Sequence, residues 1–173
     1  MNGLRGGRRT ASPVRLTLCP ALGSDIDGAW WPHTGSVARE LPELIESLHP
    51  ALGEVVDINI NWSATAGAPV LNTMSAGHMA KMGWSDRGQR LMVVVGKIAR
   101  ARLLVIPHTT AAPLARMVLR RACGMPIPLA EQETSEFQTA DRVVRSAEVE
   151  SAAWAAREAD GPTTPENTRA GTA

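Results

Sequence analysis

The residues best suited to chemistry begin with a short stretch near the start of the chain, DIDGAWWPH at 25–33. It places the carboxylate of Asp27 close to the adjacent indoles of Trp30 and Trp31, in a chain with five Trp, one Phe and no Tyr. Carboxylates act in acid–base catalysis, and an exposed indole stacks on a ligand ring or on a partner's side chain. Neighbouring side chains of a strand point to opposite faces, so we expect one indole in the core and the other available at the surface. In the competing interpretation both indoles are structural and Asp27 caps the backbone N–H groups of a turn.

A second polar stretch, VIPHTT at 105–110, also follows an apolar segment and precedes a helical pattern. It carries His108, Thr109 and Thr110, which can donate and accept hydrogen bonds. If both stretches lie at the same edge of a sheet, they form a pocket that holds Asp27, one tryptophan and these three side chains. A structure with Asp27 and His108 at opposite ends of the sheet excludes this pocket.

Other catalytic and metal-binding patterns are weak. The four histidines have no partner at i, i+4 and no cysteine or carboxylate at ligand spacing, so we expect no metal and no cofactor. The sequence contains no GxSxG, GxGxxG or P-loop motif. Cys19 and Cys123 lie far apart in the chain and form no CxxC pair, which favours two reduced thiols of a cytosolic protein.

Two basic groups of residues favour RNA as an alternative partner. The glycine- and arginine-rich start of the chain carries Arg5, Arg8 and Arg9, and an expected helix carries Arg116 and Arg120. Arginines bind the phosphate backbone of nucleic acids through charge. The formal net charge of only +1 favours the competing interpretation, in which these side chains belong to a solvated face with acidic neighbours.

The elements that must position these residues combine strands and helices. Apolar residues that alternate or run together predict strands at 14–19, 26–31, 54–62, 90–98 and 101–107, with a weaker candidate at 78–84. The two strands after residue 89 are the most apolar and are expected to form a hairpin. We therefore expect an α+β fold with an antiparallel sheet of about five strands, two helices on one face and a peripheral C-terminal helix.

Apolar residues at helical spacing predict helices at 36–53 and 109–123. Pro42 lies inside the first, and a proline in a helix interior costs about 3 kcal/mol. We therefore expect that helix to begin near Leu41, so that Pro42 takes the first helical position. The segment 129–160 has a thinner apolar stripe and is expected to form the C-terminal helix.

The length of 173 residues suits one modest core with tails. We expect a disordered basic arm at 1–12, a core domain at 13–126, a helical extension at 127–160 and a disordered tail at 161–173. The first residues lack the apolar run of a signal peptide, and charged residues interrupt the most apolar segment, 91–107. These features favour a cytoplasmic protein.

The stretch 27–32, DGAWWP, resembles the signature of a family of uncharacterised actinobacterial proteins. The resemblance includes the helical spacing at 40–44 and the strand-to-helix junction that begins at 103–107, and it covers about residues 14–125. The family is a domain of unknown function, so the resemblance implies no chemistry. It implies one compact α+β unit in a cytosolic bacterial setting.

These observations favour a small binding or regulatory module without catalytic activity, which acts through a tryptophan-bearing face. A partner protein is the first expectation. RNA bound by the basic arm and the arginine-rich helix is the second, and a small enzyme with a pocket at Asp27 and His108 is the third. The sequence leaves the oligomeric state open.

Overall fold

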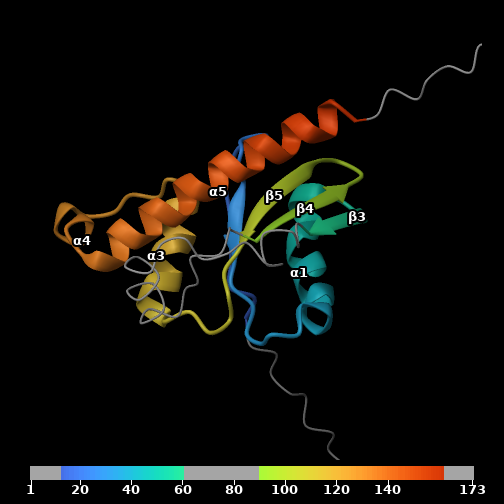
Figure 1. Ribbon diagram of the computed structural model, residues 1–173. Coiled ribbons are helices and arrows are strands. Elements are labelled where there is room, and N and C mark those ends of the chain that lie inside the picture. The colour runs from blue at the N-terminus through green and yellow to red at the C-terminus, as the bar shows by residue number, and fades with distance from the viewer. Residues whose placement is uncertain (1–12, 61–89, 162–173) are drawn as a thin grey trace, which may run out of the picture.

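A five-stranded sheet lies between helices on both of its faces in the computed structural model, which describes residues 13–60 and 90–161 (Figure 1). The α+β class and the number of strands predicted from the sequence are confirmed. The predictions of a strand at 78–84, a disordered arm at 1–12 and a disordered tail fall on residues outside the described ranges, except for Gly161.

The sheet contains one parallel pair of strands. Its members are β1 (Leu16–Leu18), β2 (Gly28–Trp30), β3 (Val55–Ile60), β4 (Leu91–Gly96) and β5 (Arg100–Val105). Their order is β1-β2-β5-β4-β3, in which β2 and β5 are parallel and the other neighbours are antiparallel. The expected β4–β5 hairpin is confirmed. The sheet is mixed because the chain crosses from β2 to the far edge and returns through the hairpin to the middle.

Helix α1 (Val37–Leu52) covers one face of the sheet. Leu44, Leu48 and Leu52 are fully buried there. The helix begins at Val37, before Pro42, which corrects the predicted start near Leu41. Pro42 removes one N–H donor, but each buried leucine contributes about 1.5–3 kcal/mol, so the apolar face of the helix outweighs that loss.

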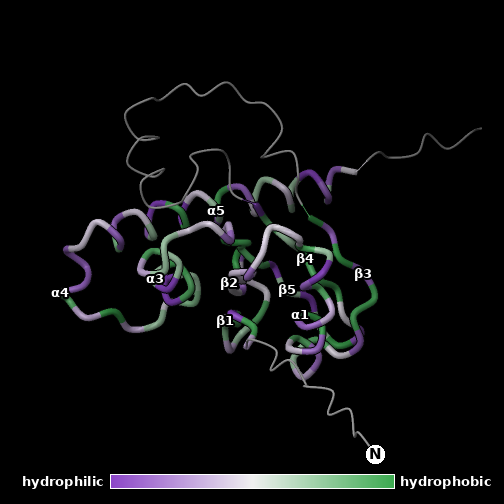
Figure 2. The backbone as a smooth tube through the Cα atoms, turned by 90° about the horizontal axis from the view of Figure 1, so that it is seen from below, coloured by the Kyte–Doolittle hydropathy of each residue, from purple (hydrophilic) through white to green (hydrophobic). Residues whose placement is uncertain are grey.

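Helices α3 (Ala112–Ala122) and α5 (Ser135–Ala159) cover the other face, and a short helix, α4 (Leu129–Gln132), connects them. The Thr134 hydroxyl caps α5 by accepting a hydrogen bond from the Phe137 N–H at 3.2 Å. The segment predicted as a helical extension therefore packs on the sheet beside α3, and Figure 1 shows α5 crossing the whole molecule. Both α1 and α3 carry hydrophilic as well as hydrophobic residues, as expected for helices with one buried face (Figure 2).

The two faces of the sheet bury two separate cores. Leu103 and Val105 of β5 contact the α1 side, whereas Leu104 and the following Ile106 contact the side of α3 and α5. The helices at 36–53 and 109–123 were predicted on the same face, and the structure places them on opposite faces. Burial on both faces explains why β5 ends in an unbroken apolar run instead of an alternating pattern.

Cys19, just after β1, and Cys123, at the end of α3, form a disulfide with a Cα–Cα distance of 5.0 Å. This bond corrects the expectation of two separate thiols. Distance along the chain does not keep two cysteines apart once the chain folds, because α3 packs against β1 and β2. Within the described ranges, no helix has both the length and the apolar composition needed to cross a bilayer.

Candidate functional site

Two turns meet at the carboxyl-terminal ends of β2 and β5, two inner strands of the sheet. The two strands are parallel neighbours, so the residues after them leave the sheet on the same side. The Ile106 N–H donates to the Trp30 carbonyl at 2.8 Å. Further out, a Cβ atom added to Gly35 would lie 3.0 Å from Cε1 of His108, so the turns touch. We call residues 32–36 and 107–111 the paired turns.

The chain diverges after the paired turns. The first turn leads into α1 on one face of the sheet, and the second leads into α3 on the other face. Adjacent parallel strands whose helices diverge in this way form a topological switch point, the place where open α/β sheets most often bind ligands. The paired turns are therefore the candidate functional site.

The guanidinium of Arg15 holds the start of the first turn. Its guanidinium lies over the Trp31 ring, with 3.4 Å between Cζ and the ring centroid. Its Nε donates to the Trp31 carbonyl at 3.0 Å, and its Nη2 donates to the Pro32 carbonyl at 2.6 Å. Burial lowers the pKa of Arg15, and the nearby charge of Glu40 acts in the opposite direction. An arginine remains charged under these conditions, so both hydrogen bonds are charge-assisted.

Glu40 holds the same turn from the first part of α1. One carboxylate oxygen accepts from the His33 N–H at 2.8 Å, and the other accepts from the Thr34 N–H at 2.5 Å. Partial burial on its own raises the pKa of Glu40, but the hydrogen bonds donated by His33 and Thr34 outweigh it. The pKa of this carboxyl therefore lies below its ordinary value.

The paired turns expose polar side chains on this fixed backbone. His33, Thr34, His108 and Thr109 are exposed, while Thr110 is buried and its N–H donates to the Pro107 carbonyl at 3.0 Å. The Nε2 atom of His33 lies 3.0 Å from the Pro13 carbonyl oxygen. Within the described ranges, His108 and Thr109 have no hydrogen-bond partner. Their imidazole and hydroxyl groups are available to a molecule that docks from outside.

Asp27 lies at the opposite end of the strands from His108. Its carboxylate accepts hydrogen bonds from the N–H groups of Gly23, Ser24 and Arg102 at 2.8, 3.0 and 2.9 Å, and only 1% of the residue is exposed. Asp27 precedes β2, whereas His108 follows β5, and the two strands run in the same direction. The predicted pocket containing both residues is therefore not assembled, and Asp27 has the turn-capping role weighed as its alternative.

Both adjacent indoles are buried, on opposite faces of the sheet. Trp30, 1% exposed, packs with α1, and Trp31, 7% exposed, packs with α3 and α5. The expected separation by the strand is confirmed, but the expected exposed indole is wrong, because helices cover both faces. The Trp31 Nε1–H finds no hydrogen-bond partner in the part of the chain that the structure describes.

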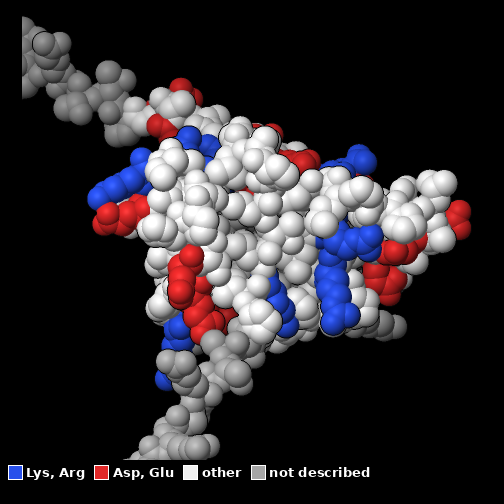
Figure 3. Space-filling view, turned by 180° about the vertical axis from the view of Figure 1, so that it is seen from behind, with Lys and Arg blue, Asp and Glu red and all other residues white. Residues whose placement is uncertain are grey.

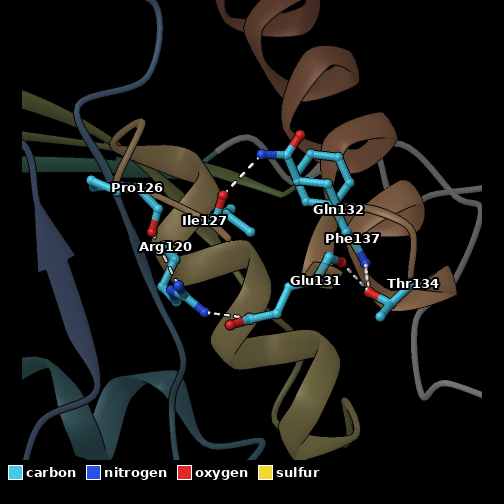
Figure 4. Close-up of polar contacts among 7 residues, drawn as sticks. All are labelled: Arg120, Pro126, Ile127, Glu131, Gln132, Thr134 and Phe137. Atoms are coloured by element: carbon cyan, nitrogen blue, oxygen red, sulfur yellow. Dashed lines mark hydrogen bonds and ion pairs between the residues drawn. The ribbon is translucent and has the colours of Figure 1, made fainter. Parts of the chain in front are cut away.

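The predicted basic patch is partly neutralised where the structure describes it. Arg120 forms an ion pair with Glu131, at 2.7 Å, and donates to the Pro126 carbonyl at 3.0 Å (Figure 4). Arg116 is exposed, and Arg121, which follows Arg120, pairs with Asp141 at 2.8 Å. Figure 3 shows acidic and basic side chains interspersed on the face that it presents. Three further members of the predicted patch lie outside the described residues: Arg5, Arg8 and Arg9.

Sequence reasoning missed Arg15, Gly35 and Glu40. Arg15 was covered only by the strand predicted at 14–19, and Glu40 only by the helical pattern at 36–53. Acidic residues near helix starts are common, which was the one available signal, but the N–H groups that Glu40 accepts from cannot be read from spacing. In the described part of the chain, no three His, Cys, Asp or Glu residues gather into a metal-binding group.

Comparison with known proteins assigns the chain to a family. The model of a family of unknown function, DUF5994, matches residues 15–122. The protein is a member of DUF5994. No curated protein and no solved structure matches this DUF5994 chain. The matched range begins at Arg15 and contains both paired turns, α1 and α3, whereas α5 lies beyond it. The narrower resemblance, to actinobacterial proteins with a DGAWWP signature, stays a prediction.

Proposed function

We propose that this DUF5994 protein is a binding module without catalytic activity, which contacts a partner protein through its paired turns. The observation that carries this proposal is that Arg15 and Glu40 fix the backbone of the first turn through hydrogen bonds. His108 and Thr109 are exposed on the turn beside it. A turn whose backbone is already ordered loses less conformational entropy on binding, and the fixed first turn gives His108 and Thr109 on the second turn a fixed neighbour. Binding residues are commonly found on loops that a rigid scaffold positions.

A protein suits this surface better than a small molecule does. The His108 ring lies against Gly35, so the turns adjoin each other instead of standing apart. A small ligand needs most of its surface buried in a concavity, whereas a protein spreads its contacts over a broad surface with a few central residues. The burial of Trp30 and Trp31 moves the proposed contact from the indoles to the turns.

The two alternatives receive less support from the structure. The Asp27 carboxylate already accepts from three N–H groups, and it lies at the strand ends opposite to His108. Both facts weaken the proposal of an enzyme built on these two residues. The Arg120–Glu131 ion pair reduces the positive charge available to RNA on α3. We keep the cytoplasmic location as part of the proposal. Thiols are largely kept reduced there, so this location requires the protein to stay folded with the Cys19–Cys123 bond open.

Site-specific cross-linking tests the proposal. A photoreactive benzoyl-phenylalanine in place of Thr109 should cross-link a discrete partner protein in an extract of the protein's own cells. The same group in place of Gln138, exposed on α5, is the matched control and should not. Adding His108→Ala to the Thr109 variant should reduce the cross-link at least tenfold while the circular dichroism spectrum stays unchanged.

Three results would contradict the proposal. The first is the same set of cross-links from both positions, and the second is no cross-link from the Thr109 position. The third is loss of the cross-link after ribonuclease treatment, which would identify RNA as the molecule in contact.

A further inference from the structure

The Cys19–Cys123 disulfide joins two parts of the fold that other contacts already hold. On α3, Leu114 and Val118 are fully buried, and Arg121 forms an ion pair with Asp141 of α5 at 2.8 Å. These contacts anchor α3 to the sheet and to α5 without the sulfur bridge. A domain of this size can build a core that does not need a covalent staple.

The loop on the Cys19 side is held in the same way. The Cys19 N–H donates to the Asp27 carbonyl at 2.7 Å, and the Asp27 carboxylate accepts from the N–H groups of Gly23 and Ser24. These hydrogen bonds close the loop between β1 and β2 through its backbone. The loop therefore has a defined shape whether or not Cys19 is bonded to Cys123.

The disulfide is not sealed inside the core. Both cysteines are only partly buried, and the next residue along, Gly124, is exposed and has open space where a Cβ atom would be. The chain contains only these two cysteines, so the bond cannot be exchanged for another one within the chain. Accessible disulfides are the ones that thiols reduce readily.

We propose that the Cys19–Cys123 disulfide is a reversible redox clasp, opened by a small thiol and closed by a small disulfide while the protein stays folded. In opening, the thiolate of the small thiol attacks one sulfur, and the bond between Cys19 and Cys123 breaks. A second small thiol then releases the mixed disulfide. The protein gains two electrons and two protons as two thiols, and the two small thiols become one disulfide.

Opening the clasp should loosen only the ends that it joins. The last turn of α3 loses its link to the β1–β2 loop, while Leu114 and Val118 stay packed in the core. The clasp lies beside Asp27, at the ends of the strands opposite to the paired turns. A failure of the clasp therefore leaves the proposed contact at the paired turns untouched, although the cytoplasmic location proposed above depends on the bond opening.

The full chain equilibrated in buffers with different ratios of reduced to oxidised glutathione tests the clasp. Free thiols are trapped with N-ethylmaleimide and counted by mass spectrometry, and near-ultraviolet circular dichroism of the tryptophans reports packing. We expect zero or two labels per chain, with the circular dichroism signal retained throughout. Amide hydrogen exchange should rise at least tenfold at 122–125 on reduction and stay unchanged at Leu114 and Val118.

A double variant, Cys19→Ser with Cys123→Ser, provides the control. It should fold, and its exchange pattern should match that of the reduced protein in every buffer. The proposal is overturned if the double variant fails to fold, or if reduction removes the near-ultraviolet signal, because the bond is then a structural staple. It is also overturned if labels appear only in denaturant, or if oxidised glutathione leaves both thiols free.

Discussion

The guanidinium of Arg15 stacks on the indole of Trp31, with its Cζ 3.4 Å from the ring centroid. The backbone strengthens this contact, because the Trp31 N–H donates to the Arg15 carbonyl at 2.8 Å. The pair connects the segment before β1 to the first of the paired turns. One side chain therefore supports both the sheet edge and the proposed binding surface.

Replacing Arg15 should weaken the fold and loosen the first turn. Arg15→Ala removes two charge-assisted hydrogen bonds and the stacking contact, and we expect a loss of about 2–3 kcal/mol in the free energy of unfolding. Arg15→Lys keeps the charge but not the planar donor pair, and it should recover less than half of that loss. Urea unfolding followed by tryptophan fluorescence measures both. Full recovery by lysine would contradict the role given to the guanidinium plane.

Glu40 should make stability depend on pH in the acidic range. Its folded pKa lies below the unfolded value, so its contribution is present above the unfolded pKa and is lost as pH falls through the folded one. Glu40→Gln should therefore be less stable than the natural protein at pH 7. The difference should be below about 1 kcal/mol, because the carboxylate is partly exposed. It should begin to shrink as pH falls through about 4.3, the ordinary glutamate pKa, and vanish only below the lower folded pKa.

The matched control for Glu40 is Glu43→Gln, which changes an exposed carboxylate one turn further along α1. Unfolding midpoints between pH 3 and pH 7 should run parallel for this variant and the natural protein. If Glu43→Gln changes the profile as much as Glu40→Gln does, a general charge effect is responsible.

Truncation of either adjacent indole should unfold much of the protein. Trp30→Ala and Trp31→Ala each leave a large cavity in one core, and we expect each to cost about 3–5 kcal/mol. Trp154→Ala, on the partly buried edge of α5, should cost clearly less. Thermal unfolding of the three variants tests this order. If Trp30→Ala or Trp31→Ala unfolds at the same temperature as the natural protein, that indole is not part of a core.

Two glycines should tolerate no side chain. A Cβ atom at Gly96 would lie 2.1 Å from the Leu52 carbonyl oxygen, and one at Gly28 would lie 2.1 Å from the Thr17 carbonyl oxygen. Since both obstacles are backbone atoms, Gly96→Ala and Gly28→Ala should each cost about 3 kcal/mol or more. Gly124→Ala meets open space but has a φ of 61°, and it should cost only about 1–2 kcal/mol. Chemical denaturation ranks the three, and the reverse ranking would contradict the packing.

The elements were predictable where one local pattern decides them. The apolar spacing at Leu44, Leu48 and Leu52 sets the buried face of α1, and the run of apolar residues after Arg90 forms the β4–β5 hairpin as expected. The start of α1 was mispredicted because local proline propensity was given more weight than the packing of the helix on the sheet. That packing depends on strands distant in the chain, so the local pattern does not contain it.

The site was harder to predict, because it depends on which strands become neighbours. The meeting of Gly35 with His108 follows from the parallel pairing of β2 with β5, and nothing in either stretch specifies that pairing. The same pairing places Asp27 at the opposite ends of these strands, away from His108. The expectation of an exposed indole failed for a related reason, since a strand pattern shows that Trp30 and Trp31 face opposite ways but not that helices cover both sides.

The pairing of β2 with β5 also has a consequence for how the chain acquires its shape during synthesis. Asp27 accepts from the Arg102 N–H, a partner 75 positions later in the chain. The first two strands leave the ribosome early but have no neighbour to dock on until the β4–β5 hairpin has emerged. The β1–β2 pair can therefore form early but docks on the sheet only after β5 has emerged, and Trp31 gains its cover later still, when α3 and α5 follow.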